Sequence, residues 1–332
     1  MPALPTVNTK LSDYDFILPR ELIAQRPLER REDSRMMVLH RTGQTIEHRQ
    51  FRDIKTFLLR GDLFVLNDTR VLPARWFSDD RAIEFLFLER LGPKRWKCLV
   101  KPGRKMRIGA TAKIDDLRLR VEEITDDGER IVALDQDVDL YDGGSMPLPP
   151  YINRPGDEKD TARYQTVFAH SAGAIAAPTA GLHFTLEILS QVPHTFVTLH
   201  VGPGTFLPVR SENITDHRMH AERFSISPEA ANAINSAQRV IGVGTTTVRT
   251  LESATRAGGE IAAQEGATNL FIYPAYRFRV VDVLLTNFHL PRSTLLMLVS
   301  AFAGREFLLR AYAEAIREQY RFYSYGDCML IQ

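Results

Sequence analysis

Cysteine and long apolar runs are both scarce in this sequence. The chain of 332 residues holds only Cys98 and Cys328, with no C-x-x-C pair, so a cysteine-rich zinc module and a disulfide framework are excluded. No basic segment followed by an apolar core opens the chain, which argues against a signal peptide. The most apolar run, residues 295–303, is far shorter than the roughly 20 residues that cross a bilayer. We therefore expect a cytoplasmic protein that makes no membrane contact.

An excess of charge of either sign is also missing. The 42 Lys and Arg residues are balanced by 41 Asp and Glu residues, for a net charge of +1. A nucleic-acid partner would therefore have to be held by a local patch. The motifs GxxxxGKS/T, GxGxxG and HExxH are absent as well, which excludes a P-loop, a Rossmann dinucleotide site and a zincin-type protease. The length favours about two domains.

The pattern of short apolar runs changes along the chain. Residues 36–47 predict a hairpin, residues 51–59 a helix and residues 63–66 a buried strand. Five short strands separated by turn residues follow, at 83–88, 96–100, 111–114, 117–124 and 131–134, and they indicate a small antiparallel barrel or sandwich. The proline-rich residues 147–155 predict an extended return connector.

The second half of the chain alternates strands with helices. Strands are predicted at 195–201, 240–243, 270–273 and 281–285, and helices at 228–238, from 248 onward, at 294–302 and at 306–320. This alternation predicts βαβ units and a mainly parallel sheet or barrel. We therefore expect an α/β fold: a discontinuous, barrel-like mixed α/β domain of residues 1–70 and 150–332, with an inserted small antiparallel β-barrel domain of residues 71–149.

Histidine is concentrated in one part of the sequence. Six of the nine His residues lie between His170 and His220, within or beside three segments, 177–185, 200–206 and 217–222. The first two segments are rich in small residues that suit close backbone packing around a ligand. Imidazoles titrate near neutral pH, so this concentration predicts a site where small backbone groups surround a ligand and histidines handle protons.

Polar residues follow three predicted strands. Asn67-Asp68-Thr69-Arg70 comes after the strand at 63–66, Gly244-Thr245-Thr246 after the strand at 240–243, and Asn287 and His289 after the strand at 281–285. Ligands of α/β proteins lie at the carboxyl ends of strands, and a helix N-terminus suits an anion. Each motif also has a purely structural interpretation: an Asx turn, an ordinary threonine cap and a core histidine, respectively.

Charge is unevenly distributed within the expected β barrel. Residues 94–107 carry seven basic side chains and no acid, whereas residues 113–142 carry eleven acids and four bases. One edge of the barrel is therefore expected to be electropositive and to suit phosphate groups. The alternative is a solvated strand edge protected by Lys and Arg.

A metal site is a further possibility. His217 and His220 have the His-x-x-His spacing that places two imidazoles on one face of a helix, with His200 and Glu222 as additional ligands. No Asp or Glu stands at a familiar ligand spacing, so proton transfer or ligand contact is the favoured role of these residues.

Taken in order, several strings resemble one family over nearly the whole chain. They are residues 18–25, 33–35, 66–75, 177–185, 200–206, 219–222, 244–252, 285–304 and 320–331. The chain resembles the S-adenosylmethionine:tRNA ribosyltransferase-isomerase family of the queuosine pathway. One departure lies between Phe77 and Ile83, where the family usually has a longer glycine-rich hairpin.

The resemblance implies a reaction and its substrates. The ribosyl part of S-adenosylmethionine is moved to 7-aminomethyl-7-deazaguanine at the wobble position of tRNAs with a GUN anticodon, and is isomerised to an epoxycyclopentanediol. The products are epoxyqueuosine-tRNA, adenine and methionine. The resemblance implies a discontinuous α/β domain with an inserted β-barrel. It also implies that no metal or redox cofactor is used, because S-adenosylmethionine is consumed as a substrate. We expect a monomer.

Residue roles follow from the chemistry that the resemblance implies. The sulfonium acidifies the C5′ hydrogens, so a base is required, and the leaving adenine and the attacking amine also exchange protons. We expect His183, His200, His220 and Glu222 to handle these protons. The residues expected to bind substrate are Asn67, Asp68, Thr69, Arg70, Thr179, Gly181, Gly202, Gly204, Thr205, Gly244, Thr245, Thr246, Arg249, Asn287 and His289. The residues expected to bind tRNA are Lys94, Arg95, Lys97, Lys101, Arg104 and Lys105.

Two other functional classes remain as alternatives. One is a non-catalytic tRNA-binding protein that uses the basic residues 94–107, which would leave the histidine-rich segments unexplained. The other is a metal-dependent hydrolase built from His200, His217 and His220.

Overall fold

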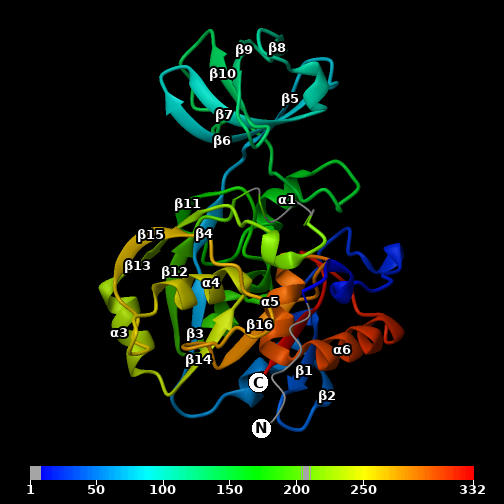
Figure 1. Cartoon of the computed structure of the whole chain (residues 1–332), viewed down its shortest axis with the longest axis vertical. Coiled ribbons are helices and arrows are strands. Elements are labelled where there is room, and N and C mark those ends of the chain that lie inside the picture. Colours follow the sequence, from blue (N-terminus) through cyan, green and yellow to red (C-terminus); the bar gives the residue numbers. More distant parts are fainter. Residues whose placement is uncertain (1–8, 203, 205–208, 210) are drawn as a thin grey trace.

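The chain folds into two lobes joined by extended segments (Figure 1). The computed structural model describes residues 9–202, 204, 209 and 211–332. The larger lobe contains a nine-stranded sheet and most of the helices, and the smaller lobe contains a six-stranded antiparallel sheet. The predicted fold, a mixed α/β domain with a small antiparallel barrel, is confirmed.

The large sheet is mixed, with a parallel centre. Its order is β15-β13-β12-β3-β14-β16-β17-β1-β2. The strands β12, β3, β14 and β16 run parallel to one another, whereas β13, β15, β17 and β2 pair antiparallel with β12, β13, β16 and β1. Their bounds are β15 (Gln264–Thr268), β13 (Glu222–Ile226), β12 (His194–Leu199), β3 (Asp62–Asn67), β14 (Arg239–Val243), β16 (Val283–Asn287), β17 (Cys328–Ile331), β1 (Arg35–His40) and β2 (Thr45–Gln50).

The central strands are apolar on both faces because helical segments cover both. On β3, Phe64 and Leu66 face one core and Val65 faces the other, as expected when successive side chains alternate across a sheet. One face is covered by α3 (Pro228–Ser236), α4 (Thr245–Ala254), α5 (Thr294–Ala303) and α6 (Arg305–Arg317). The other is covered by the 3-10 helix η4 (Phe51–Phe57) and by α2 (Leu186–Ser190). No helix of the described residues is long and apolar enough to span a membrane.

The smaller lobe is a nearly closed barrel with its own core. Its strands are β5 (Arg75–Phe77), β6 (Glu84–Gly92), β7 (Arg95–Lys101), β10 (Arg130–Leu134), β9 (Leu117–Ile124) and β8 (Thr111–Ile114), in that order. The amide of Asp79, just after β5, donates to the carbonyl of Lys113 on β8 (3.0 Å) and so brings the two sheet edges together. Phe85, Phe87 and Trp96 are fully buried inside. All five strands predicted here are present.

Residues 270–273 form no strand, so the strand prediction for this segment is wrong. The neighbouring strand is β15, which lies at the edge of the large sheet and is mostly exposed. An exposed edge strand carries little apolar pattern, so its polar sequence gave no strand signal. Leu270 instead uses its carbonyl to accept a hydrogen bond from Arg249 (3.0 Å).

The C-terminal segment enters the sheet as β17. Its four residues are all buried, and they pair with β16 on one side and β1 on the other. The sequence indicates only that this segment docks into the body of the protein. Its insertion holds the chain end beside Asn287, whose strand β16 pairs with it.

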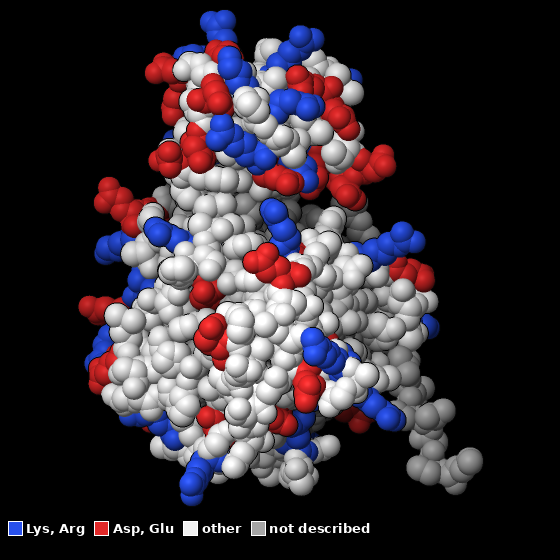
Figure 2. All heavy atoms as spheres, turned by 90° about the vertical axis from the view of Figure 1, so that its left-hand side faces the viewer, with Lys and Arg blue, Asp and Glu red and all other residues white. Residues whose placement is uncertain are grey.

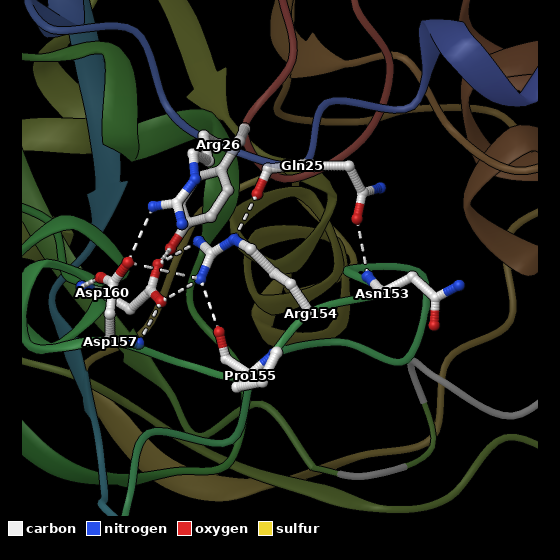
Figure 3. A network of polar contacts seen from close by, with 8 residues as sticks. Gln25, Arg26, Asn153, Arg154, Pro155, Asp157 and Asp160 are labelled. Carbon is white, nitrogen blue, oxygen red and sulfur yellow. Dashed lines mark hydrogen bonds and ion pairs between the residues drawn. The ribbon is translucent and has the colours of Figure 1, made fainter.

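An ion-pair network fastens the return connector to the N-terminal part of the chain. Arg154 binds both carboxylate oxygens of Asp160 in the first turns of α1 (Glu158–Arg163), at 2.6 and 2.7 Å. Its Nε donates to the carbonyl of Gln25 (2.9 Å), and the side chain of Gln25 accepts from the amide of Asn153 (2.6 Å). Figure 3 shows these groups converging, with Arg26 bound to Asp157 beside them.

We expect Arg154→Met to lower the free energy of unfolding by about 3–5 kcal/mol, because it leaves the buried Asp160 without its cation. The control is Arg26→Met, since the Arg26–Asp157 pair is solvent-exposed (62% and 38%) and such pairs contribute about 1 kcal/mol or less. Urea denaturation of both variants measures the difference. Equal losses would show that the network does not fasten the connector.

Candidate functional site

A pocket lies at the edge of the large sheet where the parallel strands end. Its walls come from the segment after β11 (Ser171–Ala174), the ends of β14 and β16, the start of α5, the return connector and the C-terminal loop. Six residues predicted to bind substrate line it: Thr179, Gly244, Thr245, Thr246, Asn287 and His289. Apolar side chains such as Val201, Phe288 and Leu290 form much of the remainder. An apolar pocket with a few convergent polar groups is typical of a small-molecule site.

The turn from β14 to α4 provides the floor of this substrate pocket. Gly244 has φ +86°, a left-handed conformation that L side chains rarely adopt. It lets the chain reverse from strand to helix, and the first residues of α4, Thr245 and Thr246, then face the pocket. The hydroxyl of Thr246 accepts from the side chain of Asn67 (3.3 Å), so this turn is held to the end of β3.

Asn287 presents an unused acceptor beside the pocket. Its Nδ2 donates to Nε2 of His183 (3.2 Å) and to the carbonyl of Tyr323 (3.1 Å). Its Oδ1 is buried and has no hydrogen-bond partner among the described residues. A buried polar atom without a partner is costly, and this oxygen is suited to an N–H group of a bound ligand.

His183 positions Asn287 and stays neutral. Its Nε2 accepts from Asn287, and its Nδ1 meets the hydroxyl of Ser34 (2.9 Å). Burial, with the nearby Arg31 and Arg321, lowers its pKa from 6.5 to about 3. The ring is therefore neutral at pH 7 and both of its nitrogens are engaged, by Ser34 and Asn287, which favours a positioning role over the proton transfer expected from the sequence.

His289 lines the pocket and is also neutral. Burial lowers its pKa to about 3. Its Nε2 shares a hydrogen bond with the hydroxyl of Thr286 (2.9 Å), and its amide donates to the Tyr312 hydroxyl (2.9 Å). A neutral imidazole fixed in this way suits contact with a ligand.

A second group of predicted residues gathers at the ends of β3 and β12. Asn67 bonds the backbone of Leu199 twice, at 2.9 and 3.0 Å, and so locks these two strand ends together. Asp68 accepts from the hydroxyl of Thr198 (2.6 Å). His200 meets the hydroxyl of Thr69 through Nδ1 (2.9 Å).

His200 differs from the buried histidines because it is half-buried. Burial lowers its pKa, and the nearby Arg223 lowers it further, whereas Asp68 opposes the shift. The ring is therefore neutral at pH 7, as a base must be before it takes up a proton. Of the predicted proton-handling histidines, His200 thus combines access with a suitable protonation state.

Glu222 and Arg249 form a buried ion pair. Glu222 Oε2 binds Arg249 Nη1, and its Oε1 accepts from the amide of Gly202 (2.9 Å). Arg249 also donates to the carbonyl of Leu270 (3.0 Å). Arg249 therefore has an anionic partner within the protein, while Arg70 is exposed. Substrate binding by Arg70 and Arg249 stays a prediction.

The remaining candidates lie farther out or outside the described residues. His220 is exposed beside Gly204, and Gly181 packs against Phe168 and Thr166. Thr205 lies outside the described residues.

No helix covers the described residues 217–221, so the His-x-x-His spacing does not place two imidazoles on one helix face. Within the described ranges no three His, Cys, Asp or Glu residues are grouped to hold a metal.

The basic residues of the small barrel are interleaved with acids. Figure 2 shows Lys, Arg, Asp and Glu side by side over this lobe. Lys97 pairs with Glu89 (2.9 Å), which the neighbouring strand β6 places opposite it, and Arg95 pairs with Glu122 (2.8 Å) of β9, across the intervening β10. The expected separation into a positive edge is therefore wrong for these two positions. Lys101, Arg104 and Lys105 are exposed, and tRNA binding by Lys94–Lys105 stays a prediction.

Among the residues of the pocket wall that sequence reasoning did not predict to bind substrate are Tyr151, Tyr323 and Ser324. The hydroxyls of Tyr151 and Ser324 share a hydrogen bond (2.6 Å) and join the return connector to the C-terminal loop. The only signal was the composition of the C-terminal segment, which indicated docking without indicating where.

Comparisons with known proteins agree on one family. The family model described as "Queuosine biosynthesis protein" matches residues 11–331. An S-adenosylmethionine:tRNA ribosyltransferase-isomerase of Desulforamulus reducens is 47% identical, covering 97% of this chain and 99% of its own. The enzyme of the same name from Symbiobacterium thermophilum is 49% identical over the same shares. The crystal structure of an S-adenosylmethionine tRNA ribosyltransferase from Thermotoga maritima covers 96% of this chain and 100% of its own, with 40% identity and a TM-score of 0.55.

The neutral state of His183 makes stability depend on pH. Its folded pKa of about 3 lies below the unfolded value near 6.5, so the unfolded chain binds the extra proton between these values. Its contribution to stability is therefore present above about pH 6.5 and is lost as the pH falls towards 3, by up to about 1.4 kcal/mol per pH unit. We expect His183→Gln to flatten this slope in urea denaturation between pH 7 and 4.5.

The matched control is His170→Gln, because His170 is exposed. It should retain the wild-type slope. A wild-type slope in His183→Gln would mean that His183 is already protonated in the folded protein.

Proposed function

The chain belongs to the queuosine biosynthesis family of S-adenosylmethionine:tRNA ribosyltransferase-isomerases, and we propose that its substrate pocket is where that reaction takes place. The enzyme transfers the ribosyl group of S-adenosylmethionine to 7-aminomethyl-7-deazaguanine at the wobble position of tRNA and isomerises it. It releases adenine and methionine and leaves epoxyqueuosine in the tRNA. One observation supports this location for the reaction: six residues predicted to bind substrate line one pocket, beside the unpartnered Oδ1 of Asn287.

The pocket suits S-adenosylmethionine in its chemistry. The buried Oδ1 of Asn287 accepts an N–H, which both the adenine amino group and the methionyl ammonium can donate. The apolar wall of Val201, Phe288 and Leu290 suits a purine face and the methylene chain. The hydroxyls of Thr245 and Thr246 at the start of α4 suit ribose hydroxyls.

His200 is the base that this arrangement favours. The reaction begins when a proton leaves C5′, which the adjacent sulfonium acidifies, and a neutral imidazole takes such a proton up. His200 is neutral at pH 7 because burial lowers its pKa, and it is oriented by the Thr69 hydroxyl. His220 and Glu222 stand on the same side of the chain and are proposed to assist adenine departure and to keep the acceptor amine neutral.

The enzyme is proposed to work without a metal or redox cofactor. The atoms transferred come from S-adenosylmethionine, whose sulfonium both activates the C5′ hydrogen and supplies methionine as the leaving group. We further propose that the tRNA partners have a GUN anticodon, that the protein acts as a monomer, and that it works in the cytoplasm, where its tRNA substrate is found.

Adenine release tests the function directly. Purified protein incubated with S-adenosylmethionine should release adenine only when the tRNA carries 7-aminomethyl-7-deazaguanine, with a matching mass gain on that nucleoside. Chelator should leave the rate unchanged. If adenine appears with neither tRNA, the non-catalytic binding protein becomes the better account. If chelator abolishes the activity, the metal-dependent hydrolase becomes the better account.

Variants of His200 and His183 distinguish the role of a base from that of a positioning residue. We expect His200→Ala to lower kcat at least about 100-fold, the usual contribution of a general base, with KM for S-adenosylmethionine nearly unchanged. His183→Ala should instead raise that KM because Asn287 loses its anchor.

His183→Gln provides the control for this comparison. Its side-chain oxygen can accept from Asn287 as the imidazole Nε2 does, so it should restore the KM. A wild-type kcat in His200→Ala would remove His200 as the base. Failure of His183→Gln to restore KM would remove the positioning role.

A further inference from the structure

A second cleft lies next to the substrate pocket and is lined by arginines. Arg30, Arg31 and Arg163 line it together with His183, Ser324 and Tyr325. Ser324 lines both the cleft and the substrate pocket. His183 faces the cleft and bonds Asn287 of the pocket. The pocket and the arginine cleft therefore lie next to each other and share a wall.

Two of the three guanidinium groups at the arginine cleft, those of Arg31 and Arg163, are not paired with carboxylates, whereas Arg30 pairs with Glu32. Arg31 donates to the carbonyls of Leu182, Ala162 and Gln165, at 3.0, 3.0 and 2.9 Å. Arg163 donates to the carbonyl of Glu29 (2.7 Å). Within the described ranges neither forms an ion pair, and Nε of Arg163 is buried without a hydrogen-bond partner.

Nearby carboxylates are already engaged elsewhere. Asp160 is bound by Arg154, Asp157 by Arg26 (Figure 3), and Glu32 by Arg30 at the rim of the cleft. Arg321, behind the cleft, likewise bonds a carbonyl, that of Arg26, and has one buried Nη1 without a partner among the described residues.

The charges at the cleft also repel one another. Burial and, to a smaller extent, the neighbouring Arg163 together lower the pKa of Arg31 to about 10. Burial lowers the pKa of Arg163 as well. Arg31 and Arg163 are held close together, neither is bound by a carboxylate, and Nε of Arg163 is unused, so both are stabilised by binding an anion.

We propose that the arginine cleft binds a phosphodiester group of the tRNA, next to the nucleotide whose base enters the substrate pocket. This inference rests on the proposed function, because it takes tRNA as the partner. The competing anion is the carboxylate of S-adenosylmethionine. That carboxylate is flanked by an ammonium and a sulfonium, which arginines without a nearby acid repel, whereas a phosphodiester carries only negative charge.

Arg163→Gln is the variant that tests the proposal, because Arg163 is only half-buried and its loss leaves the three carbonyl bonds of Arg31 in place. We expect the Kd for tRNA to rise about tenfold, as for one lost charge-assisted contact. The slope of log Kd against log salt concentration should fall by about 0.7–0.9, the value for one phosphate contact. KM for S-adenosylmethionine should be unchanged.

Arg163→Lys and Arg26→Gln are the matched controls. The lysine keeps the charge and should retain most of the salt slope. Arg26 lies close by, but its charge is already paired with Asp157, so its replacement should leave the tRNA affinity at the wild-type value. Circular dichroism and thermal unfolding confirm that each variant is folded.

The proposal is overturned if folded Arg163→Gln binds tRNA with the wild-type Kd and salt slope. It is also overturned if only KM for S-adenosylmethionine rises, which would assign the cleft to the carboxylate. Because tRNA binding is measured without turnover, this failure is distinct from a failure of wild-type protein to release adenine, which would contradict the proposed function itself.

Discussion

The parallel alignment of β12, β3, β14 and β16 is the constraint on which the site depends. Parallel strands end at one edge of a sheet, so the residues that follow each strand meet there although they are far apart in sequence. Asn67 reinforces this alignment, because its side chain bonds Leu199 of β12 and Thr246 of α4 at once. The small barrel is inserted after β3 and the short strand β4 (Thr69–Val71), and it stands above this edge (Figure 1).

Burial gives different protonation behaviour to histidines that the sequence alone does not distinguish. His183 and His289 are both buried with pKa values of about 3, since a charged imidazole would lose its hydration without gaining an anion. They act as neutral hydrogen-bonding groups. His200 is half-buried and His220 exposed. None of the six histidines between His170 and His220 lines the pocket, whereas His289 does, so the concentration of histidine in the sequence does not by itself locate the pocket, and depth within the fold decides which rings are open to proton exchange.

How much the sequence predicts depends on which physical signal each element carries. Strands such as β3 are apolar on both faces and were found from their runs of apolar residues, and polar residues at their ends located the pocket. The edge strand β15 is mostly exposed and β13 beside it alternates buried with more exposed side chains, so neither carries a continuous apolar run. The partners of Glu222 and Asn287 were also hidden, because hydrogen bonds between distant segments depend on tertiary packing.

The charged residues show most clearly what the sequence alone does not predict. The basic run of the barrel is typical of a phosphate-binding edge, yet antiparallel register brings Glu89 beside Lys97, and Glu122 reaches Arg95 from the strand beyond β10. Around the arginine cleft the sequence is mixed, with Glu29, Glu32, Asp157 and Asp160 close to the arginines along the chain. There the fold directs the acids to Arg154, Arg26 and Arg30 and leaves Arg31 and Arg163 with backbone carbonyls. A site for an anion is therefore defined by cations that the fold leaves without acidic partners. A run of basic residues in the sequence does not show which cations those are.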